Sequence, residues 1–230
     1  NGFNTLSCWM WGSQLVSEDD AVKTGIINWT SWMSNETDFG YASAGAYNMI
    51  DASMYNRMSD TDFRKLMWKA PAGTALDGKS QWLKPAYAES TPVYGSLKFR
   101  PANGAYQTPN EGAVSAYPLM RVEEMYFIEA EAAIRLGEGT GLLVDFMTKY
   151  RDPEYVCRAT APEDVLGEVV FQKRVDLWGE GHSFFDFKRL DMSVTRGYAG
   201  TNHQDATRFN TDGRPAWMSF SIVRTEENNN

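Results

Sequence analysis

The chain is poor in cysteine and histidine and carries no recognisable metal-binding motif. In 230 residues it has two cysteines, Cys8 and Cys157, and two histidines, His182 and His203. No Cys-x-x-Cys pair and no Cys/His cluster is present, so we do not expect a zinc site. Two cysteines permit one disulfide, but pairing depends on a geometry that sequence does not reveal, and the question stays open.

Long apolar runs and basic runs are also missing. No segment approaches the ~20 apolar residues needed to span a bilayer, and no signal peptide or lipidation motif is visible. With a net charge of −8 and a pI near 4.9, the chain is not expected to bind nucleic acid. The acidic balance suits a soluble face that meets neutral ligands. Because the chain starts at Asn1 rather than at Met, we expect it to be part of a longer protein.

Aromatic residues, by contrast, are abundant, with 8 Trp, 11 Tyr and 12 Phe. Trp and Tyr combine a large apolar area with a polar tip, so they fill cores or form binding surfaces. Pyranose rings pack on such aromatic faces, while neighbouring amides and carboxylates bond the sugar hydroxyls. The densest aromatic set lies in the first 41 residues, interleaved with Glu36 and Asp38. We predict seven glycan-binding residues there: Trp9, Trp11, Trp29, Trp32, Tyr41, Asn28 and Asn35.

The arrangement of these tryptophans depends on local structure. Trp9 and Trp11 share a face if the chain is extended, and Trp29 and Trp32 share one if it is helical. A local hydrophobic core is the alternative at every position. The neighbours of Trp11 and Trp32 in the sequence favour an exposed position for these two residues. The other four tryptophans are expected to be structural: Trp68, Trp82, Trp178 and Trp217.

Residues 1–115 form a loop-rich, aromatic region, which we take as the candidate ligand-binding face. Short helices are predicted at 17–27, at 45–58 and from Asp60 onward, and a short strand at 93–99. Six prolines between residues 71 and 118 interrupt any longer pattern.

Residues 116–230 form a helical region followed by irregular chain from residue 191. Helices are predicted at 119–136 and 142–150, and a third begins at a capping box, Thr160-Ala161-Pro162-Glu163, and ends near Trp178 before Gly179 and Gly181. Residues 124–153 resemble one tetratricopeptide unit, with an ordinary helical hairpin as the alternative. Either hairpin has apolar faces that need partners, in the aromatic half or in polypeptide outside this chain.

Four further segments carry a resemblance to a known family. Residues 121–132 (Arg-Val-Glu-Glu-Met-Tyr-Phe-Ile-Glu-Ala-Glu-Ala) look like the characteristic helix of SusD/RagB proteins. Residues 171–181 together with 184–189 are similar to that family's second signature, and 60–65 and 222–230 match it more weakly. The resemblance spans roughly residues 45–230. The sequence departs from the family at 172–174, a Gln-Lys-Arg run, and at His182, where Arg is common.

The resemblance implies a mainly α fold, a tetratricopeptide-like α/α scaffold with long irregular loops and little β structure. It implies a non-catalytic lipoprotein on the extracellular face of an outer membrane, anchored through an N-terminal lobe of the same protein that is not in this chain. Its partner would be a SusC-like TonB-dependent transporter, and its ligand a nutrient glycan used in polysaccharide utilisation. Some relatives of this type, like RagB, bind oligopeptides instead.

Two other functions stay open. A glycoside hydrolase needs two carboxylates at a set separation across a cleft, and a helical-repeat scaffold would use its aromatics as core. No catalytic triad, phosphate-binding glycine loop or metal triad is present, so no catalytic residues and no cofactor are predicted. Calcium at residues 17–20 is possible, although the spaced acidic loop is missing. A charged set is interpreted as a structural ion-pair network: Arg174, Asp176, Glu180, Asp186, Lys188 and Arg189.

Overall fold

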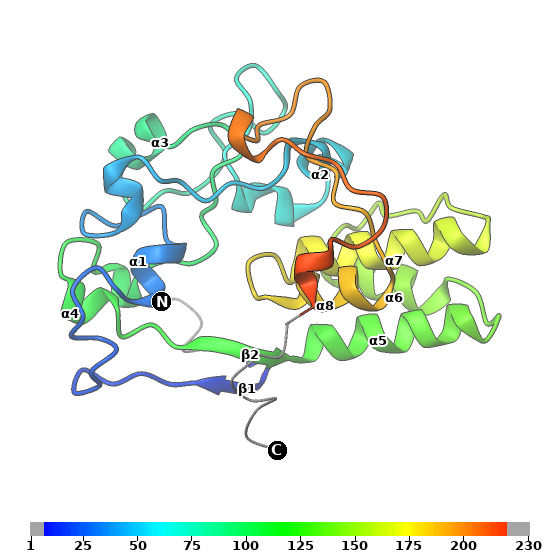
Figure 1. Ribbon diagram of the computed structural model, residues 1–230, viewed down its shortest axis with the longest axis horizontal. Helices are drawn as coiled ribbons and strands as arrows, with labels where there is room; N and C mark the ends of the chain where they lie inside the picture. Colours follow the sequence, from blue (N-terminus) through cyan, green and yellow to red (C-terminus); the bar gives the residue numbers. More distant parts are fainter. Residues whose placement is uncertain (1–6, 220–230) are drawn as a thin grey trace, which may run out of the picture. The chain divides into compact units, whose positions relative to one another are not determined.

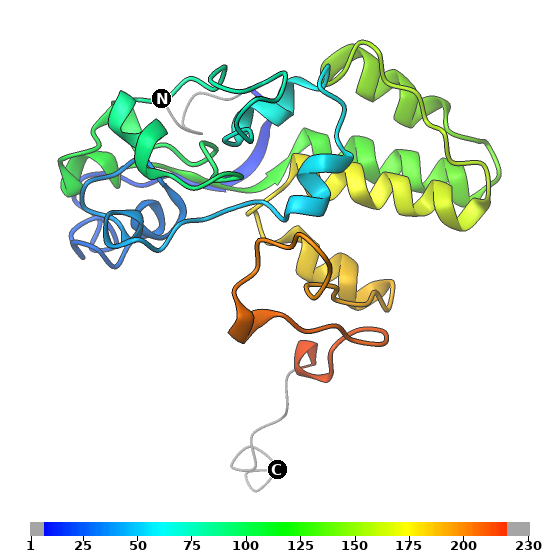
Figure 2. The same ribbon diagram turned by 90° about the horizontal axis from the view of Figure 1, so that it is seen from above.

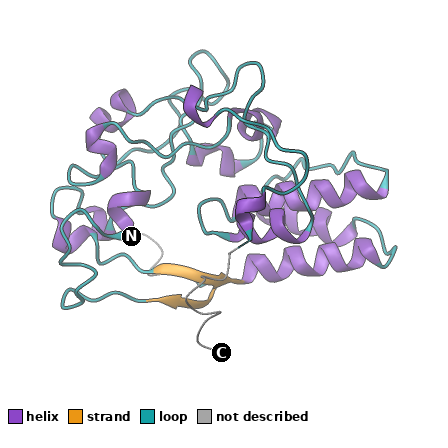
Figure 3. Ribbon diagram, viewed as in Figure 1, coloured by secondary structure: helices purple, strands orange, loops and turns teal. Residues whose placement is uncertain are grey.

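The computed structural model describes residues 7–219 and is mainly helical, with long irregular loops and one two-stranded ribbon in this range (Figures 1 and 3). The prediction of a mainly α fold with little β structure is therefore confirmed. The described chain divides into two compact units after Glu180. The change from loop-rich to helical chain near residue 116 thus lies within the first unit.

The ribbon pairs β1 (Trp9–Ser13) with β2 (Tyr117–Arg121) in antiparallel register, with irregular steps around Trp11. A Cβ atom on Gly12 would lie 2.6 Å from the Trp9 ring and 2.9 Å from the carbonyl oxygen of Tyr117. The absence of a side chain at Gly12 therefore leaves room for the Trp9 ring to pack against the backbone of β1. The predicted helix at 119–136 was wrong at its start, because residues 119–121 belong to β2, which pairs with a segment over a hundred residues earlier.

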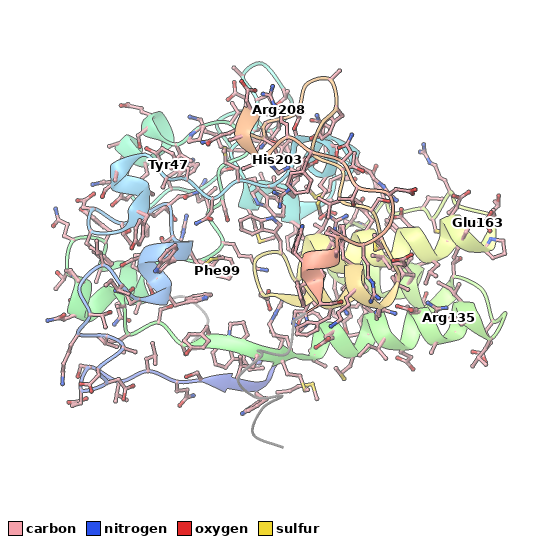
Figure 4. All side chains as sticks on the ribbon, in the orientation of Figure 1. Tyr47, Phe99, Arg135, Glu163, His203 and Arg208 are labelled. Atoms are coloured by element: carbon pink, nitrogen blue, oxygen red, sulfur yellow. The ribbon has the colours of Figure 1, made fainter. Side chains whose placement is uncertain are left out.

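Three helices form the helical part of the first unit: α5 (Val122–Arg135), α6 (Gly141–Tyr150) and α7 (Pro162–Asp176). Figure 2 shows α5 and α7 running alongside each other, and Arg135 and Glu163 mark the shared end of this pair in Figure 4. Phe127 and Ala130 of α5 pack against Leu143 and Met147 of α6 and Val169 of α7. The small side chain of Ala130 allows α5 to approach its neighbours closely.

The bounds of α6 and the start of α7 match the predictions closely, but the predicted cap of α7 does not form. Helix α6 occupies the predicted segment, and α7 begins with Pro162 in its first turn. The capping box does not form, because Ala161 rather than Thr160 takes the N-cap position and no side chain caps the helix. Gly179 adopts a φ of +77°, a conformation that suits glycine and stops the chain from continuing as a helix.

The loop-rich part of the first unit contains only short helices. These are α1 (Trp29–Met33), α2 (Ala52–Arg57), α3 (Pro85–Ser90) and α4 (Pro109–Gly112), with 3₁₀ turns at 41–44, 63–67 and 102–104.

Three predictions in this part were wrong. Residues 17–27 form turns, because the Asp19 carboxylate accepts the Val16 backbone N–H at 2.8 Å and Gly25 has a φ of +67°. The helix expected from residue 45 begins only at Ala52, where the Asp51 carboxylate provides the cap. Residues 93–99 are not a strand, since Tyr94 has a φ of +70° that breaks the extended run.

The loop-rich part packs on α7 through a core centred on Trp68, which is 0% exposed. The loop-rich part contributes Ile50 and Tyr55 to this core, and α7 contributes Phe171 and Val175. Part of the apolar surface of the helices is therefore buried by the aromatic half, one of the two locations that the sequence left open.

The second unit holds α8 (His182–Arg189), 3₁₀ turns at 205–207 and 216–218, and a bridge between Thr195 and Asn210. Helix α8 was not predicted from the sequence. Trp217 is 60% exposed, which contradicts its predicted structural role. The family-like ending at 222–230 lies outside the described residues. No helix within residues 7–219 combines the length and the apolarity that a bilayer crossing requires.

Candidate functional site

Two of the predicted binding residues, Trp32 and Tyr41, form an exposed aromatic pair on the loop-rich part. Their ring centroids are 4.4 Å apart and their planes are inclined by 37°. Trp32 is 56% exposed, and Tyr41 is half-buried beneath it. We call Trp32 and Tyr41 the aromatic platform. Because the rings already pack on each other, the platform is ordered before any ligand arrives.

Two asparagine side chains hydrogen-bond the backbone on either side of Trp32. Asn28 caps α1, accepting the Ser31 N–H at 2.9 Å and donating to the Gly25 carbonyl at 2.6 Å. Asn35 donates to the carbonyls of Asn48 and Ser96 at 2.7 Å and 3.0 Å and accepts the Asn48 N–H at 2.9 Å. A helix as short as α1 has little stability of its own, so these bonds fix where Trp32 points.

Gly40 sets the approach of Tyr41 to Trp32. A Cβ atom at this position would collide with the Thr37 hydroxyl and lie 2.8 Å from the Ser31 carbonyl oxygen. Replacing Gly40 with alanine should therefore push the loop away from α1, separate the two rings and cost about 1–3 kcal/mol of unfolding free energy. Near-ultraviolet circular dichroism reports the ring pair, and urea unfolding reports the stability.

Gly141→Ala is the matched control for this substitution. No atom lies within 4 Å of a Cβ built there, and a helical alanine is favoured over glycine by roughly 1 kcal/mol. It should leave the aromatic spectrum unchanged. An unchanged spectrum in the Gly40→Ala protein as well would show that Gly40 does not position the pair.

A polar cluster lies on the same loop as Tyr41. The Asp38 carboxylate accepts bonds from Lys84 Nζ at 2.6 Å and from the Tyr87 hydroxyl at 2.8 Å. Lys84 also sits 4.3 Å and 4.6 Å from the ring centres of Tyr87 and Tyr106. Burial opposes ionisation, but the bonds from Lys84 and Tyr87 prevail and lower the pKa of Asp38. The charges of this cluster are thus paired with each other.

Glu36 ties the platform loop to a distant segment. Its side chain is 1% exposed and accepts the Leu83 N–H at 2.7 Å and Arg100 Nε at 2.6 Å. Burial raises the pKa of Glu36, although the Leu83 N–H and Arg100 act in the opposite direction. The acidic residues interleaved with the tryptophans therefore fix the loop in place. Their partners, Lys84 and Arg100, were not predicted from the sequence.

The other predicted residues do not join the platform. The Trp29 ring packs on Phe99 and Tyr117 at 4.9 Å and 5.5 Å, with Phe99 labelled in Figure 4. Although Trp29 and Trp32 share the helix α1, they contact different partners and do not form one surface.

Asn28 and Asn35 are only 6% and 3% exposed, and their amides bond the backbone, so the structure gives them a structural role in place of the predicted ligand contact. Trp9 is half-buried across Gly12, and Trp11 is 65% exposed on β1.

A second concentration of charge lies buried between the loop-rich part and α7. Asp176 accepts Arg151 Nε at 2.5 Å, Arg64 Nη1 at 3.2 Å and Arg121 Nη2 at 3.5 Å. Glu180 accepts Lys98 Nζ at 2.5 Å and Arg121 Nε at 2.8 Å. We call these six residues the ion-pair network. Burial opposes ionisation of Asp176. The hydrogen bond from Arg151 and the charges of Arg64, Arg151 and Arg121 outweigh it and lower the pKa of Asp176 to about 2.

The network confirms the structural interpretation of Asp176 and Glu180 and identifies partners that the sequence did not. Asp186 pairs instead with Arg189 within the second unit, at 2.8 Å. Within residues 7–219 no three acidic, histidine or cysteine side chains are grouped as metal ligands would be. The cysteines described, Cys8 and Cys157, are both free thiols.

Comparison with known proteins identifies relatives of this fold. A family model described as the SusD family matches residues 31–230. The crystal structure of a SusD-like carbohydrate-binding protein from Bacteroides vulgatus ATCC 8482 superposes with a TM-score of 0.67 at 20% sequence identity. The match covers 98% of this chain and 48% of that chain, so the present chain spans about half the length of its structural relative. Among curated proteins, none matches the sequence.

Proposed function

Because this chain belongs to the SusD family, we propose that it binds nutrient glycans at the cell surface and delivers them to a SusC-like TonB-dependent transporter. The printed description of the structural relative names it as carbohydrate-binding, which supports the ligand class. The SusD family is associated with the outer membrane and the cell surface. Anchoring by a lipid on an N-terminal lobe, and assembly with the transporter, are parts of the same proposal.

The observation that carries the proposal is the aromatic platform. An indole that is 56% exposed and packed against a second ring presents an ordered aromatic face to solvent. The C–H faces of a pyranose match such a ring. Since Trp32 is already stacked on Tyr41, little side-chain entropy remains to be lost on binding.

The surroundings of the platform favour an uncharged ligand. Lys84 and Asp38 pair with each other, and Arg100 pairs with buried Glu36. Charges that are already neutralised by a partner offer little attraction to a charged ligand, whereas their remaining hydrogen-bonding groups can still meet hydroxyls. A neutral oligosaccharide therefore fits the site better than an acidic one.

Replacing Trp32 with alanine should weaken glycan binding by at least about tenfold, a loss of ~1.4 kcal/mol. The measurement is retardation in native gels containing each of a panel of polysaccharides, followed by titration calorimetry with the glycan that binds. The same incubations should release no new reducing ends, because the proposed function is binding without cleavage.

Trp11→Ala is the matched control, since Trp11 is equally exposed, at 65%, but lies on β1 rather than in the platform. It should bind normally. If Trp11→Ala loses binding and Trp32→Ala retains it, the site lies on the ribbon and the platform assignment is wrong. Binding of peptides but of no glycan would contradict the proposed ligand class, and release of sugars would contradict a purely binding role.

A further inference from the structure

The first unit contains a cavity of about 380 Å³ next to the ion-pair network. Its size falls within the ~300–1,000 Å³ typical of small-ligand pockets. Apolar walls come from Phe63 and Met67, and polar groups from Cys8, Arg100 and Glu123. Five members of the network complete the lining: Arg64, Lys98, Arg121, Arg151 and Asp176. The proposed function makes no use of this cavity.

The cations around the cavity are already bonded. Lys98 Nζ donates to the carbonyls of Asp176 and Trp178 and to Glu180, which uses all three of its protons. The Arg64 guanidinium bonds Asp62, Asp176 and Gln172. An anionic ligand would therefore find few unused donors.

Glu123 differs from the other carboxylates of the cavity because only one of its two oxygen atoms is paired with a cation. Its Oε1 atom pairs with Arg121 at 3.0 Å and with Arg151 at 3.2 Å. Its Oε2 atom is buried and accepts no hydrogen bond from any residue in the described range. A buried acceptor without a donor is unfavourable, and the Glu123 residue is only 8% exposed. The donor nearest to this carboxylate in the cavity is the weak S–H group of Cys8, so the Oε2 atom can still accept a stronger donor.

The donor that fits is an uncharged one. A cation entering the cavity would meet Arg100, Arg151 and their neighbours, so like-charge repulsion opposes it. A hydroxyl group carries a donor without charge, and the apolar walls of Phe63 and Met67 suit the C–H face of a sugar ring. We propose that this cavity is a second glycan subsite, which takes one uncharged sugar residue with a hydroxyl donated to Glu123 Oε2. This inference rests on the proposed function.

Cys8 provides a reporter inside the cavity that is independent of the platform. The thiol is half-buried and lines the cavity. A protein carrying Cys157→Ser leaves Cys8 as its one thiol, which can be modified with iodoacetamide. Burial, and then the charge of Glu123, raise the pKa of the Cys8 thiol, so the labelling is run at a fixed, mildly alkaline pH.

The oligosaccharide that binds the intact protein should slow Cys8 modification by a factor of 1 + [L]/Kd, about elevenfold at ten times the dissociation constant. Phe63→Ala removes a wall that is 53% exposed, and therefore should fold normally. This variant should lose most of the protection while keeping binding at the platform. Glu123→Gln should reduce the protection as well, because it replaces the unused carboxylate oxygen.

The outcomes separate the two proposals. If the glycan binds and Trp32→Ala abolishes that binding, yet Cys8 reacts at the same rate with and without saturating glycan, the second subsite is disproved and the proposed function stands. If no glycan binds at all, the proposed function itself fails. Equal protection of Cys157 in a protein that carries Cys8→Ser would show a general change in reactivity and would also overturn the subsite.

Discussion

Replacing Asp176 with alanine should lower the free energy of unfolding of the first unit by about 3–5 kcal/mol, because it leaves buried cations without their counter-charge. The Asp176 side chain is 4% exposed, and Arg64, Arg121 and Arg151 all pair with it. A loss of this size is a large part of the ~5–15 kcal/mol by which most domains are stable. Urea unfolding followed by tryptophan fluorescence measures it.

A pH series distinguishes the charge of Asp176 from its packing. The pKa of Asp176 is lowered from 3.8 to about 2 in the folded protein. A carboxyl with a depressed folded pKa stabilises the fold above the unfolded value, and this contribution is lost as the pH falls from 3.8 toward 2. The alanine variant lacks this part of the acid transition, so its stability should change less over that interval.

Asp60→Ala is the control for the same experiments. Asp60 pairs with Lys65 at 2.6 Å, but its side chain is 55% exposed. Solvent-exposed ion pairs contribute about 0–1 kcal/mol, so the loss should be small. If the two alanine variants unfold at the same urea concentration, the ion-pair network does not hold the first unit together.

Replacing Trp68 with alanine should cost about 3–5 kcal/mol, the range for removing a large buried aromatic side chain. Its ring is 0% exposed and packs edge-on against Trp178 at 6.1 Å. The same core joins Ile50 to Val175 of α7. The substitution would therefore leave a new void in the core between the loop-rich part and α7. Thermal unfolding should then begin at a lower temperature.

Trp68→Phe tests whether the loss follows the volume removed. A phenylalanine fills more of the site than alanine and leaves a smaller cavity, so its cost should be clearly lower. If the Trp68→Ala protein unfolds at the same temperature as the unchanged protein, this core contributes little to the junction.

The parts of the fold that the sequence predicted are those whose signals are local. Helix α6 and the start of α7 at Pro162 follow from periodicity, a proline in the first turn and glycines beyond the end. The exposed positions of Trp11 and Trp32 followed from small or flexible neighbours. Each of these inferences needed only residues within one or two turns of the position concerned.

The errors have a common physical origin in contacts between distant residues. Residues 119–121 carry a helical pattern but form a strand, because β1 supplies hydrogen-bonding partners that no local window contains. Asn28 and Asn35 resembled sugar ligands by type, yet their amides satisfy the buried backbone. Lys84 pairs with Asp38 across 46 residues, and nothing in the sequence around Lys84 indicates this contact.

These long separations also determine the order in which the molecule can be assembled. Arg64 meets Asp176 across 112 residues, Arg57 meets Glu168 across 111, and Lys98 meets Glu180 across 82. Closing such loops is entropically costly before any contact is gained, and folds dominated by distant contacts form slowly. The short helices near the platform cannot persist alone. The aromatic platform would therefore be assembled late in folding, so a misfolded chain would lack it.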